Sequence, residues 1–240
     1  MHSGPALAGK VETPKPFEVA ADLLNAARME ERKEVEALLL RLKGVEPPPP
    51  EKMAEATAFW VNLYNGLVAW KKFINPEGVH TAKGRETFFS KEAVALKVGE
   101  WSLDDIEHGV LRANAPRGLQ KRPQIPVADP RSRFVLKKVD PRIHGALNCG
   151  AASCPPIAFY DPEQLEDQLN IAISNLILES VYDPEAGELK ISKIFDWYRE
   201  DFENPPLLEW WDRFYKNDSY RKARKEGKDI KINYLDYKWK

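Results

Sequence analysis

The sequence has 240 residues, of which 43% are hydrophobic and 30% are charged, as is typical of a globular protein with a sizeable core. Its 36 basic and 37 acidic side chains nearly cancel, so no strong net charge is present to attract nucleic acid or an anionic membrane. No apolar run reaches the roughly 18 residues of a membrane span, and the N-terminus has no signal-peptide pattern, so we expect a cytoplasmic protein.

The N-terminal part has a helical pattern. Apolar residues recur at spacings of three and four over residues 17–42 and predict helix, with a break near residues 29–31. Four consecutive prolines at 47–50 then form a short, stiff segment that is the best candidate for a linker. We therefore divide the chain into a helical N-terminal extension, residues 1–50, and an α+β domain, residues 51–240.

The segment from 51 to 76 predicts a central buried helix. It begins with acidic residues and ends with lysines, which suits the helix dipole, and its apolar face is nearly continuous. Asn62 and Asn65 lie within this segment and must find hydrogen-bond partners if they are buried. Such asparagines are either structural clamps or residues of a site.

The remaining segments predict a mixture of strands and helices. A strand region over residues 88–101, with a turn at Gly99, leads into a helix capped by Ser102 and Asp105. Further along the chain, the expected elements are strands at 133–139 and 143–149, a helix at 161–181, a strand and a short helix at 187–202, a helix at 205–215 and a closing strand at 229–240. The predicted fold class is α+β: a single compact mixed domain with a small antiparallel sheet, a central buried helix and the N-terminal helical extension.

Both cysteines of the chain lie in RIHGALNCGAASCPP, residues 142–156, together with a histidine. Acyl transfer by cysteine needs a thiolate, a histidine that takes its proton and a third group that orients the imidazole. Cys149 or Cys154, His144 and the acid Glu107 are the candidates for these roles. In an extended strand His144 and Cys149 would be about 16 Å apart, so their contact requires the strand to end early.

The two cysteines are not equivalent as nucleophiles. Two prolines follow Cys154 and remove backbone donors beside it, which favours Cys149 and leaves Cys154 as the second choice. Free amide groups of the small-residue turn, helped by Asn62 or Asn148, could form an oxyanion hole. The candidate binding residues are Asn62, Asn65, Asn148 and His108.

The cysteine stretch also fits roles without acyl transfer. Free cysteine is often simply buried. Glu107 and His108 are helix neighbours that do not face each other, which is typical of a solvated helix edge or of a clamp that supports a site, more than of a catalytic pair. A redox pair of Cys149 and Cys154 is possible if the loop brings their Cα atoms within about 7 Å. The cysteine spacing does not suit zinc, so we predict no metal and no cofactor.

Five stretches together resemble the family known as the domain of unknown function 547: AFWVNLYNGLV (58–68), WSLDDIEHGVLR (101–112), DPRIHGALNCGAASCPPI (140–157), ISKIFDWYREDF (191–202) and INYLDYKWK (232–240). The resemblance implies a cysteine-peptidase-like domain in which histidine precedes cysteine, as in a permuted papain-like arrangement. It implies His144 with Cys149 or Cys154 as catalytic residues and Glu107 as the orienting acid.

Three functions follow as hypotheses. The first is a thiol hydrolase or acyl transferase acting on a peptide or γ-glutamyl-type amide. The second is a thiol-redox or glutathione-linked module that uses Cys149 and Cys154, and the third is a noncatalytic protein-interaction domain. The expected partner is a small peptide-like or thiol substrate, with no nucleic acid and no membrane, and the sequence leaves the oligomeric state open.

Overall fold

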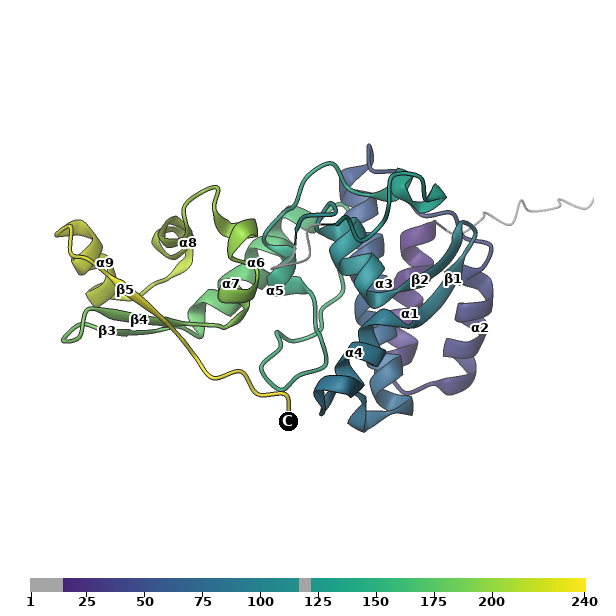
Figure 1. The fold of residues 1–240 in the computed structure, drawn as a ribbon, viewed down its shortest axis with the longest axis horizontal. Coiled ribbons are helices and arrows are strands. Elements are labelled where there is room, and N and C mark those ends of the chain that lie inside the picture. The colour runs from purple at the N-terminus through teal and green to yellow at the C-terminus, as the bar shows by residue number, and fades with distance from the viewer. Residues whose placement is uncertain (1–14, 117–121) are drawn as a thin grey trace, which may run out of the picture.

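A computed structural model describes residues 15–116 and 122–240, and it is a mostly helical α+β structure with two small sheets. Figure 1 shows two lobes side by side, with the N-terminal helices in one and the three-stranded sheet in the other. The elements of the first lobe are α1 (Pro16–Arg28), α2 (Arg32–Leu42), α3 (Met53–Ile74), η1 (Pro76–Val79), α4 (Ala82–Ser90), β1 (Glu92–Leu96), β2 (Gly99–Ser102), the π-helical η2 (Asp105–Leu111), η3 (Pro130–Phe134) and α5 (Ile143–Ala146).

Helix α6 (Leu165–Leu178) joins this lobe to the second, whose elements are β3 (Val181–Asp183), β4 (Glu188–Ile191), α7 (Ile194–Trp197), η4 (Arg199–Phe202), α8 (Leu207–Phe214), α9 (Asp218–Lys225) and β5 (Lys231–Tyr234). The apolar side chains of α6 are divided between the lobes. Leu169 and Ala172 pack in the first core, whereas Ile173 and Leu176 pack in the second. One helix thus fixes the two lobes to each other.

The centre of the first lobe is α3, which confirms the expected central buried helix. Phe59 and Trp60 are completely buried within it. Helix α1 packs directly against α3, because Gly66 lets the backbone of Leu24 approach to 3.1 Å from the position a Cβ would take. The predicted break between α1 and α2 is also confirmed, and Glu30 there has a positive φ of 59°.

The two strands predicted over 133–139 and 143–149 are wrong. The first region contains η3 and an irregular segment, and the second begins with the helical turn α5. The Asp140 carboxylate accepts a hydrogen bond from the backbone N–H of Arg142 at 3.0 Å, and its backbone oxygen accepts from Ile143, which starts a turn. His144 therefore lies on a helical turn instead of a strand.

The strand region predicted over 88–101 needs a smaller correction. Residues up to Ser90 belong to α4, a helix that the sequence pattern did not predict, and the strands β1 and β2 follow. The capping of the next helix is confirmed, since Asp105 N–H donates to Ser102 Oγ at 3.0 Å and Ser102 N–H donates to Asp105 Oδ2 at 3.1 Å.

The second lobe contains a mixed sheet. Strands β3 and β4 pair antiparallel, as β1 and β2 do in the first lobe, but β5 pairs with β4 in parallel. The small antiparallel sheet expected from the sequence is thus only part of the strand pairing. A parallel pair needs a long connection, and α7, η4, α8 and α9 supply it.

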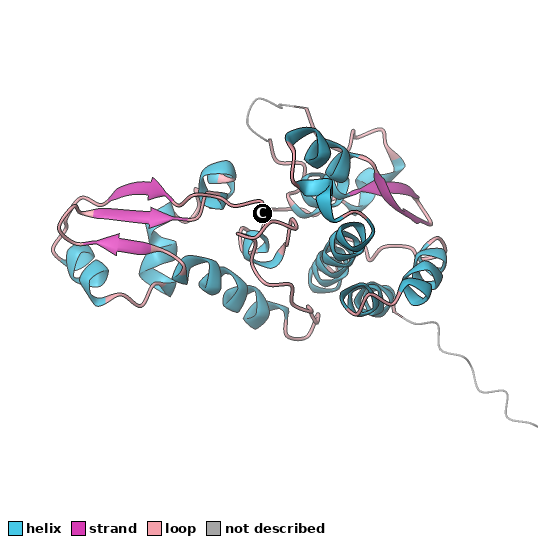
Figure 2. Cartoon of the chain, turned by 90° about the horizontal axis from the view of Figure 1, so that it is seen from below, coloured by secondary structure: helices cyan, strands magenta, loops and turns pink. Residues whose placement is uncertain are grey.

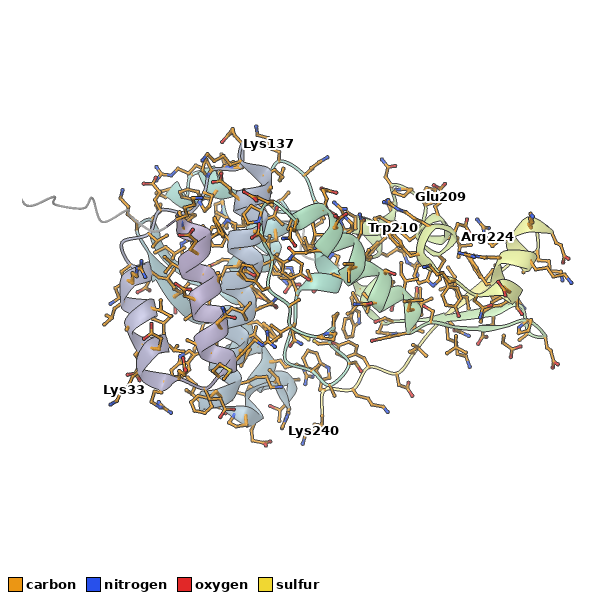
Figure 3. All side chains as sticks on the ribbon, turned by 180° about the vertical axis from the view of Figure 1, so that it is seen from behind. Lys33, Lys137, Glu209, Trp210, Arg224 and Lys240 are labelled. Carbon is orange, nitrogen blue, oxygen red and sulfur yellow. The ribbon has the colours of Figure 1, made fainter. Side chains whose placement is uncertain are left out.

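The chain after β5 turns back from the second lobe to the first. Figure 3 shows Lys240 beside the helices of the first lobe, whereas Glu209, Trp210 and Arg224 lie on the second. Lys238 fixes this return, because its backbone N–H donates to Ser153 Oγ at 2.9 Å and its oxygen accepts from Ser153 N–H at 3.1 Å. We call residues 235–240 the C-terminal tail. No helix in the described part of the chain has the length and apolarity needed to cross a membrane.

Candidate active site

A cavity of about 610 Å³ lies where both lobes and the C-terminal tail meet. Figure 2 shows the end of the tail between the two lobes. The cavity is lined by four of the predicted catalytic residues, Glu107, His144, Cys149 and Cys154, and by the predicted binding residue His108. An aromatic wall completes it, formed mainly by Phe89, Trp197, Tyr198, Tyr237 and Trp239.

His144 is held in one orientation by a buried carboxylate. Its Nε2 lies 2.8 Å from Asp201 Oδ2, and both side chains are only 2% exposed. The imidazole stacks on Tyr198 with ring centroids 4.0 Å apart, and Phe202 contacts it from a centroid distance of 5.5 Å. Stacking and hydrogen bonding together leave the ring little freedom to rotate.

Asp201 is in turn bound by Arg112. The guanidinium donates from Nε to Oδ2 at 2.6 Å and from Nη2 to Oδ1 at 2.9 Å. Burial alone would raise the pKa of Asp201, but the hydrogen bonds and charges of His144 and Arg112 outweigh it and lower the pKa to about 2. An ionised Asp201 accepts from Nε2–H and therefore leaves Nδ1 of His144 unprotonated in the neutral ring.

Nδ1 is the second ring nitrogen of His144. Among residues 15–116 and 122–240, no hydrogen bond of the structure uses this atom. His144 lines the cavity, and an unprotonated imidazole nitrogen has the chemistry of a proton acceptor.

The two cysteines form a hydrogen-bonded pair at the same cavity. The backbone N–H of Cys149 donates to Cys154 Sγ at 3.0 Å, and the hydroxyl oxygen of Tyr237 lies 3.0 Å from Cys149 Sγ and 3.3 Å from Cys154 Sγ. Both thiols are free.

The environment separates the acidities of the two thiols. Hydrogen bonds from Cys149, from Tyr237 and from backbone groups of the loop together lower the pKa of Cys154 to about 7 in spite of burial. The same thiol pair, together with burial, raises the pKa of Cys149. Cys154 is therefore the more acidic thiol of the pair, and the backbone N–H of Cys149 donates to its sulfur.

Asparagine side chains hold the cysteine loop. Asn148 Nδ2 donates to the oxygen of Pro155 at 2.7 Å, and Asn148 Oδ1 accepts from Gly150 N–H at 2.8 Å. Asn65 of α3 donates to the oxygen of Ala146 at 3.0 Å and accepts from Asn148 N–H at 2.9 Å. These bonds fix the loop relative to α3 and α5.

Asn62 holds a segment further along the chain in the same way. It donates to the oxygen of Tyr160 at 2.8 Å and accepts from the N–H of the same residue at 2.9 Å. Asn62 and Asn65 are fully buried, and neither they nor Asn148 line the cavity. The structure thus places the three predicted binding asparagines on backbone groups that support the site.

Glu107 lies at the cavity but is not hydrogen-bonded to His144. Its carboxylate accepts from the hydroxyls of Tyr64 at 2.7 Å and Tyr198 at 2.6 Å. Burial would raise the pKa of Glu107, but His108 and the two hydroxyls produce a net lowering. Tyr198, whose hydroxyl donates to Glu107, stacks on the His144 imidazole, and the carboxylate hydrogen-bonded to His144 is that of Asp201 instead of Glu107.

His108 is surrounded by charged side chains. Its Nε2 lies 3.7 Å from Asp104 Oδ1, and its Nδ1 lies 3.9 Å from Glu107 Oε1 and 3.5 Å from Arg112 Nη1. The expected solvated helix edge is wrong for Glu107 and His108, since both are buried. The π-helical geometry of η2 brings these neighbours to one cavity.

Sequence reasoning missed three residues of the site: Arg112, Asp201 and Tyr237. Each lies in a stretch that carries the family resemblance, namely 101–112, 191–202 and 232–240. Asp201 is one of several acidic residues in these stretches, and nothing in the spacing distinguishes it from the acids on the surface. Within the part of the chain that the structure describes, no group of three or more His, Cys, Asp or Glu residues is arranged to hold a metal ion.

The fold and the cavity define a mostly helical α+β protein in which thiols, an imidazole and carboxylates meet at one cavity. The chain belongs to the family described as "Protein of unknown function, DUF547", which matches residues 51–177. This confirms the family for residues 51–177, which contain Glu107, His144 and both cysteines. The stretches 191–202 and 232–240 lie outside the match, and the match gives no support for a peptidase-like or permuted papain-like domain. Comparison with curated proteins and with solved structures gave no match.

Proposed function

We propose that this protein transfers an acyl group from an amide or ester to its own Cys154 and then to an acceptor, with hydrolysis as the result when the acceptor is water. The observation that carries the proposal is the buried His144–Asp201 hydrogen bond of 2.8 Å at a cavity that also contains two thiols. An imidazole held in a single tautomer by an ionised carboxylate is the arrangement that general-base activation of a nucleophile requires.

In the proposed reaction, His144 first accepts a proton and then donates it, in each of the two steps. Nδ1 of His144 takes the proton of the Cys154 thiol, and the sulfur attacks the acyl carbon, so that the carbonyl π electrons move to oxygen. When the carbonyl re-forms, the bond to the leaving group breaks, and the leaving group receives the proton from Nδ1. A water or another acceptor then repeats the steps on the thioester and releases free Cys154. Asp201 stays ionised throughout and stabilises the imidazolium.

The choice of Cys154 over Cys149 rests on hydrogen bonds. Cys154 accepts from Cys149 N–H and lies within 3.3 Å of the Tyr237 hydroxyl, so its thiolate is stabilised. Sequence reasoning favoured Cys149 because of the prolines after Cys154. The loop geometry supports the reverse order, with Cys149 as a donor to the nucleophile.

The substrate class remains the one suggested by the sequence, a peptide or γ-glutamyl-type amide. The aromatic wall of the cavity can cover the apolar parts of such a substrate, and Arg85 at the cavity stacks on Trp239 at 4.3 Å. The proposed chemistry is similar to that of a cysteine peptidase. The family resemblance also implies the order of His144 before Cys154 in the chain.

The proposal is tested with an activated ester as a general acyl donor. Mixing the protein with p-nitrophenyl acetate is expected to release one equivalent of nitrophenolate rapidly and to leave an acetyl group on Cys154, located by peptide mass spectrometry. Cys154→Ala should abolish the burst, while Cys149→Ala, the matched control from the same loop, should keep it with a slower rate. Equal bursts from all three proteins would contradict the proposal.

A thiol-redox module is the second candidate, and one observation favours it. Both sulfurs lie within hydrogen-bond distance of the single Tyr237 hydroxyl, so a small movement of the loop would bring them together. Equilibration with glutathione buffers followed by mass spectrometry separates the candidates. A Cys149–Cys154 disulfide that forms reversibly within the cytosolic range favours the redox module, whereas thiols that stay reduced there remove it.

A further inference from the structure

The proposed acyl transfer needs a hydrogen-bond donor for the oxyanion, and the asparagines expected to supply it are already in use. The side-chain nitrogen and oxygen of Asn62 are both hydrogen-bonded to the backbone of Tyr160. Those of Asn65 are hydrogen-bonded to the backbone of Ala146 and Asn148. Asn148 donates to Pro155. Besides the backbone N–H of Cys149, a side-chain donor does lie close to the sulfur of Cys154, namely the hydroxyl of Tyr237.

We infer that the hydroxyl of Tyr237, delivered by the C-terminal tail, donates the hydrogen bond that stabilises the oxyanion formed on Cys154. The inference rests on the proposed function and names a further catalytic residue for it. The hydroxyl oxygen lies 3.3 Å from Cys154 Sγ, inside the cavity that both residues line. An oxyanion donor must lie about 3 Å from the position that the oxygen of the adduct takes next to the nucleophile.

The free enzyme and the adduct use the same hydroxyl differently. Before attack, the Tyr237 hydroxyl interacts with the two sulfurs. When the Cys154 sulfur forms its bond to carbon, the negative charge leaves the sulfur and appears on the carbonyl oxygen beside it. The Tyr237 hydroxyl then donates to this oxygen instead of to the sulfur, so its hydrogen bond is strongest in the transition state.

The surroundings of Tyr237 keep its proton in place and its ring fixed. Burial, together with the interactions with the two cysteine sulfurs, raises the pKa of the phenol, so it stays a donor at neutral pH. Its ring packs edge-to-face against Trp197 at 4.6 Å and against Trp239 at 5.4 Å. The two hydrogen bonds between Lys238 and Ser153 attach the next residue of the tail to the cysteine loop.

The test compares two reactions of the same sulfur in the full chain. Acylation by p-nitrophenyl acetate forms an oxyanion, whereas alkylation by iodoacetamide proceeds by displacement and forms none. For Tyr237→Phe, we expect the acylation rate on its high-pH plateau to fall about 100- to 1,000-fold. The alkylation rate on its own plateau should change less than about threefold, because the thiolate is fully formed in both proteins.

Tyr234→Phe is the matched control. It removes a tyrosine hydroxyl from the end of β5, where Arg199 donates to it at 2.8 Å outside the cavity, and both rates should stay at the wild-type level. Replacing Tyr237 by 3-fluorotyrosine keeps the shape and the hydroxyl, so acylation should be retained. This second variant keeps the test valid if Tyr237→Phe loosens the tail.

The outcomes separate the inference from the proposed function. Equal falls in acylation and alkylation, or an unchanged acylation rate in Tyr237→Phe, would overturn the oxyanion role while leaving Cys154 as the acylated residue. Absence of any acetyl group on Cys154 in the wild-type protein would instead overturn the proposed function, and the inference with it.

Discussion

Asp201 decides which nitrogen of His144 is available at the cavity. Its carboxylate is buried between the imidazole and the guanidinium of Arg112, so it has the two partners that a buried charge requires. The sequence predicted His144 and the two cysteines from their residue types alone. It could not identify Asp201, because the pairing joins residues 57 positions apart that lie on elements of different lobes.

Asp201→Asn tests this pairing through stability. The pKa of Asp201 is depressed from 3.8 to about 2, so the stabilisation is fully present above pH 4 and is lost as the pH falls toward 2. In the wild-type protein, this group alone should lower the free energy of unfolding by about 2 kcal/mol over that window. The variant should lack this component and, at neutral pH, be less stable by about 3 kcal/mol because Arg112 loses its counter-charge.

Urea unfolding between pH 2 and pH 7 measures both effects. Asp196→Asn is the matched control, because Asp196 is 31% exposed and pairs with the surface cations Lys193 and Arg199. It should cost less than about 1 kcal/mol. If the free energy of unfolding falls with decreasing pH in the same way for Asp201→Asn as for the wild-type protein, Asp201 does not carry the charge at this site.

At the scale of elements, long periodic helices were predictable and short site elements were not. The continuous apolar face of α3 identified it from the sequence, and the period of α1 and α2 did the same. Helix α5 has only four residues, too few for any periodicity, and its surroundings decide its conformation. Gly145 allows α5 to press against α6, since a Cβ there would lie 2.6 Å from the backbone of Ala172.

Gly145→Ala tests the importance of this close approach. The added methyl group would meet backbone atoms that cannot move aside, so we expect a loss of about 1–3 kcal/mol in the free energy of unfolding. Because His144 precedes Gly145, the burst with p-nitrophenyl acetate should also slow. Gly44→Ala is the control, since its Cβ would meet nothing closer than 3.7 Å and the change should be neutral or stabilising. Equal stabilities of the two variants would contradict the close packing of α5 on α6.

At the scale of the whole molecule, the site depends on segments from nearly the whole described chain. The family match begins at residue 51, yet α1 fills the first core beside α3, and Leu23 is completely buried there. The sequence separated residues 1–50 as an extension because the four prolines look like a linker. A proline segment does not show which helices pack against each other. The sequence also did not predict that the C-terminal tail brings Tyr237 to the cysteines.

Leu23→Ala tests whether α1 is part of the cooperative core. Removing this buried side chain should lower the free energy of unfolding by about 2–5 kcal/mol, in a single transition that includes the second lobe. Leu40→Ala on α2 is the matched control, since Leu40 is 64% exposed and should change stability by less than about 0.5 kcal/mol. A small loss for Leu23→Ala, or separate melting of α1, would show that residues 1–50 form an independent extension.

The proposed function requires Cys154 to be an activated thiol at the cavity that His144 also lines, and the pH dependence of alkylation is its sharpest test. The rate of iodoacetamide reaction would be followed separately for the peptides that contain Cys149 and Cys154. Cys154 should reach half of its maximal rate near pH 7, and Cys149 should react only at much higher pH. Faster reaction of Cys149, or ordinary titration of both thiols near the reference value of about 8.5, would contradict the account.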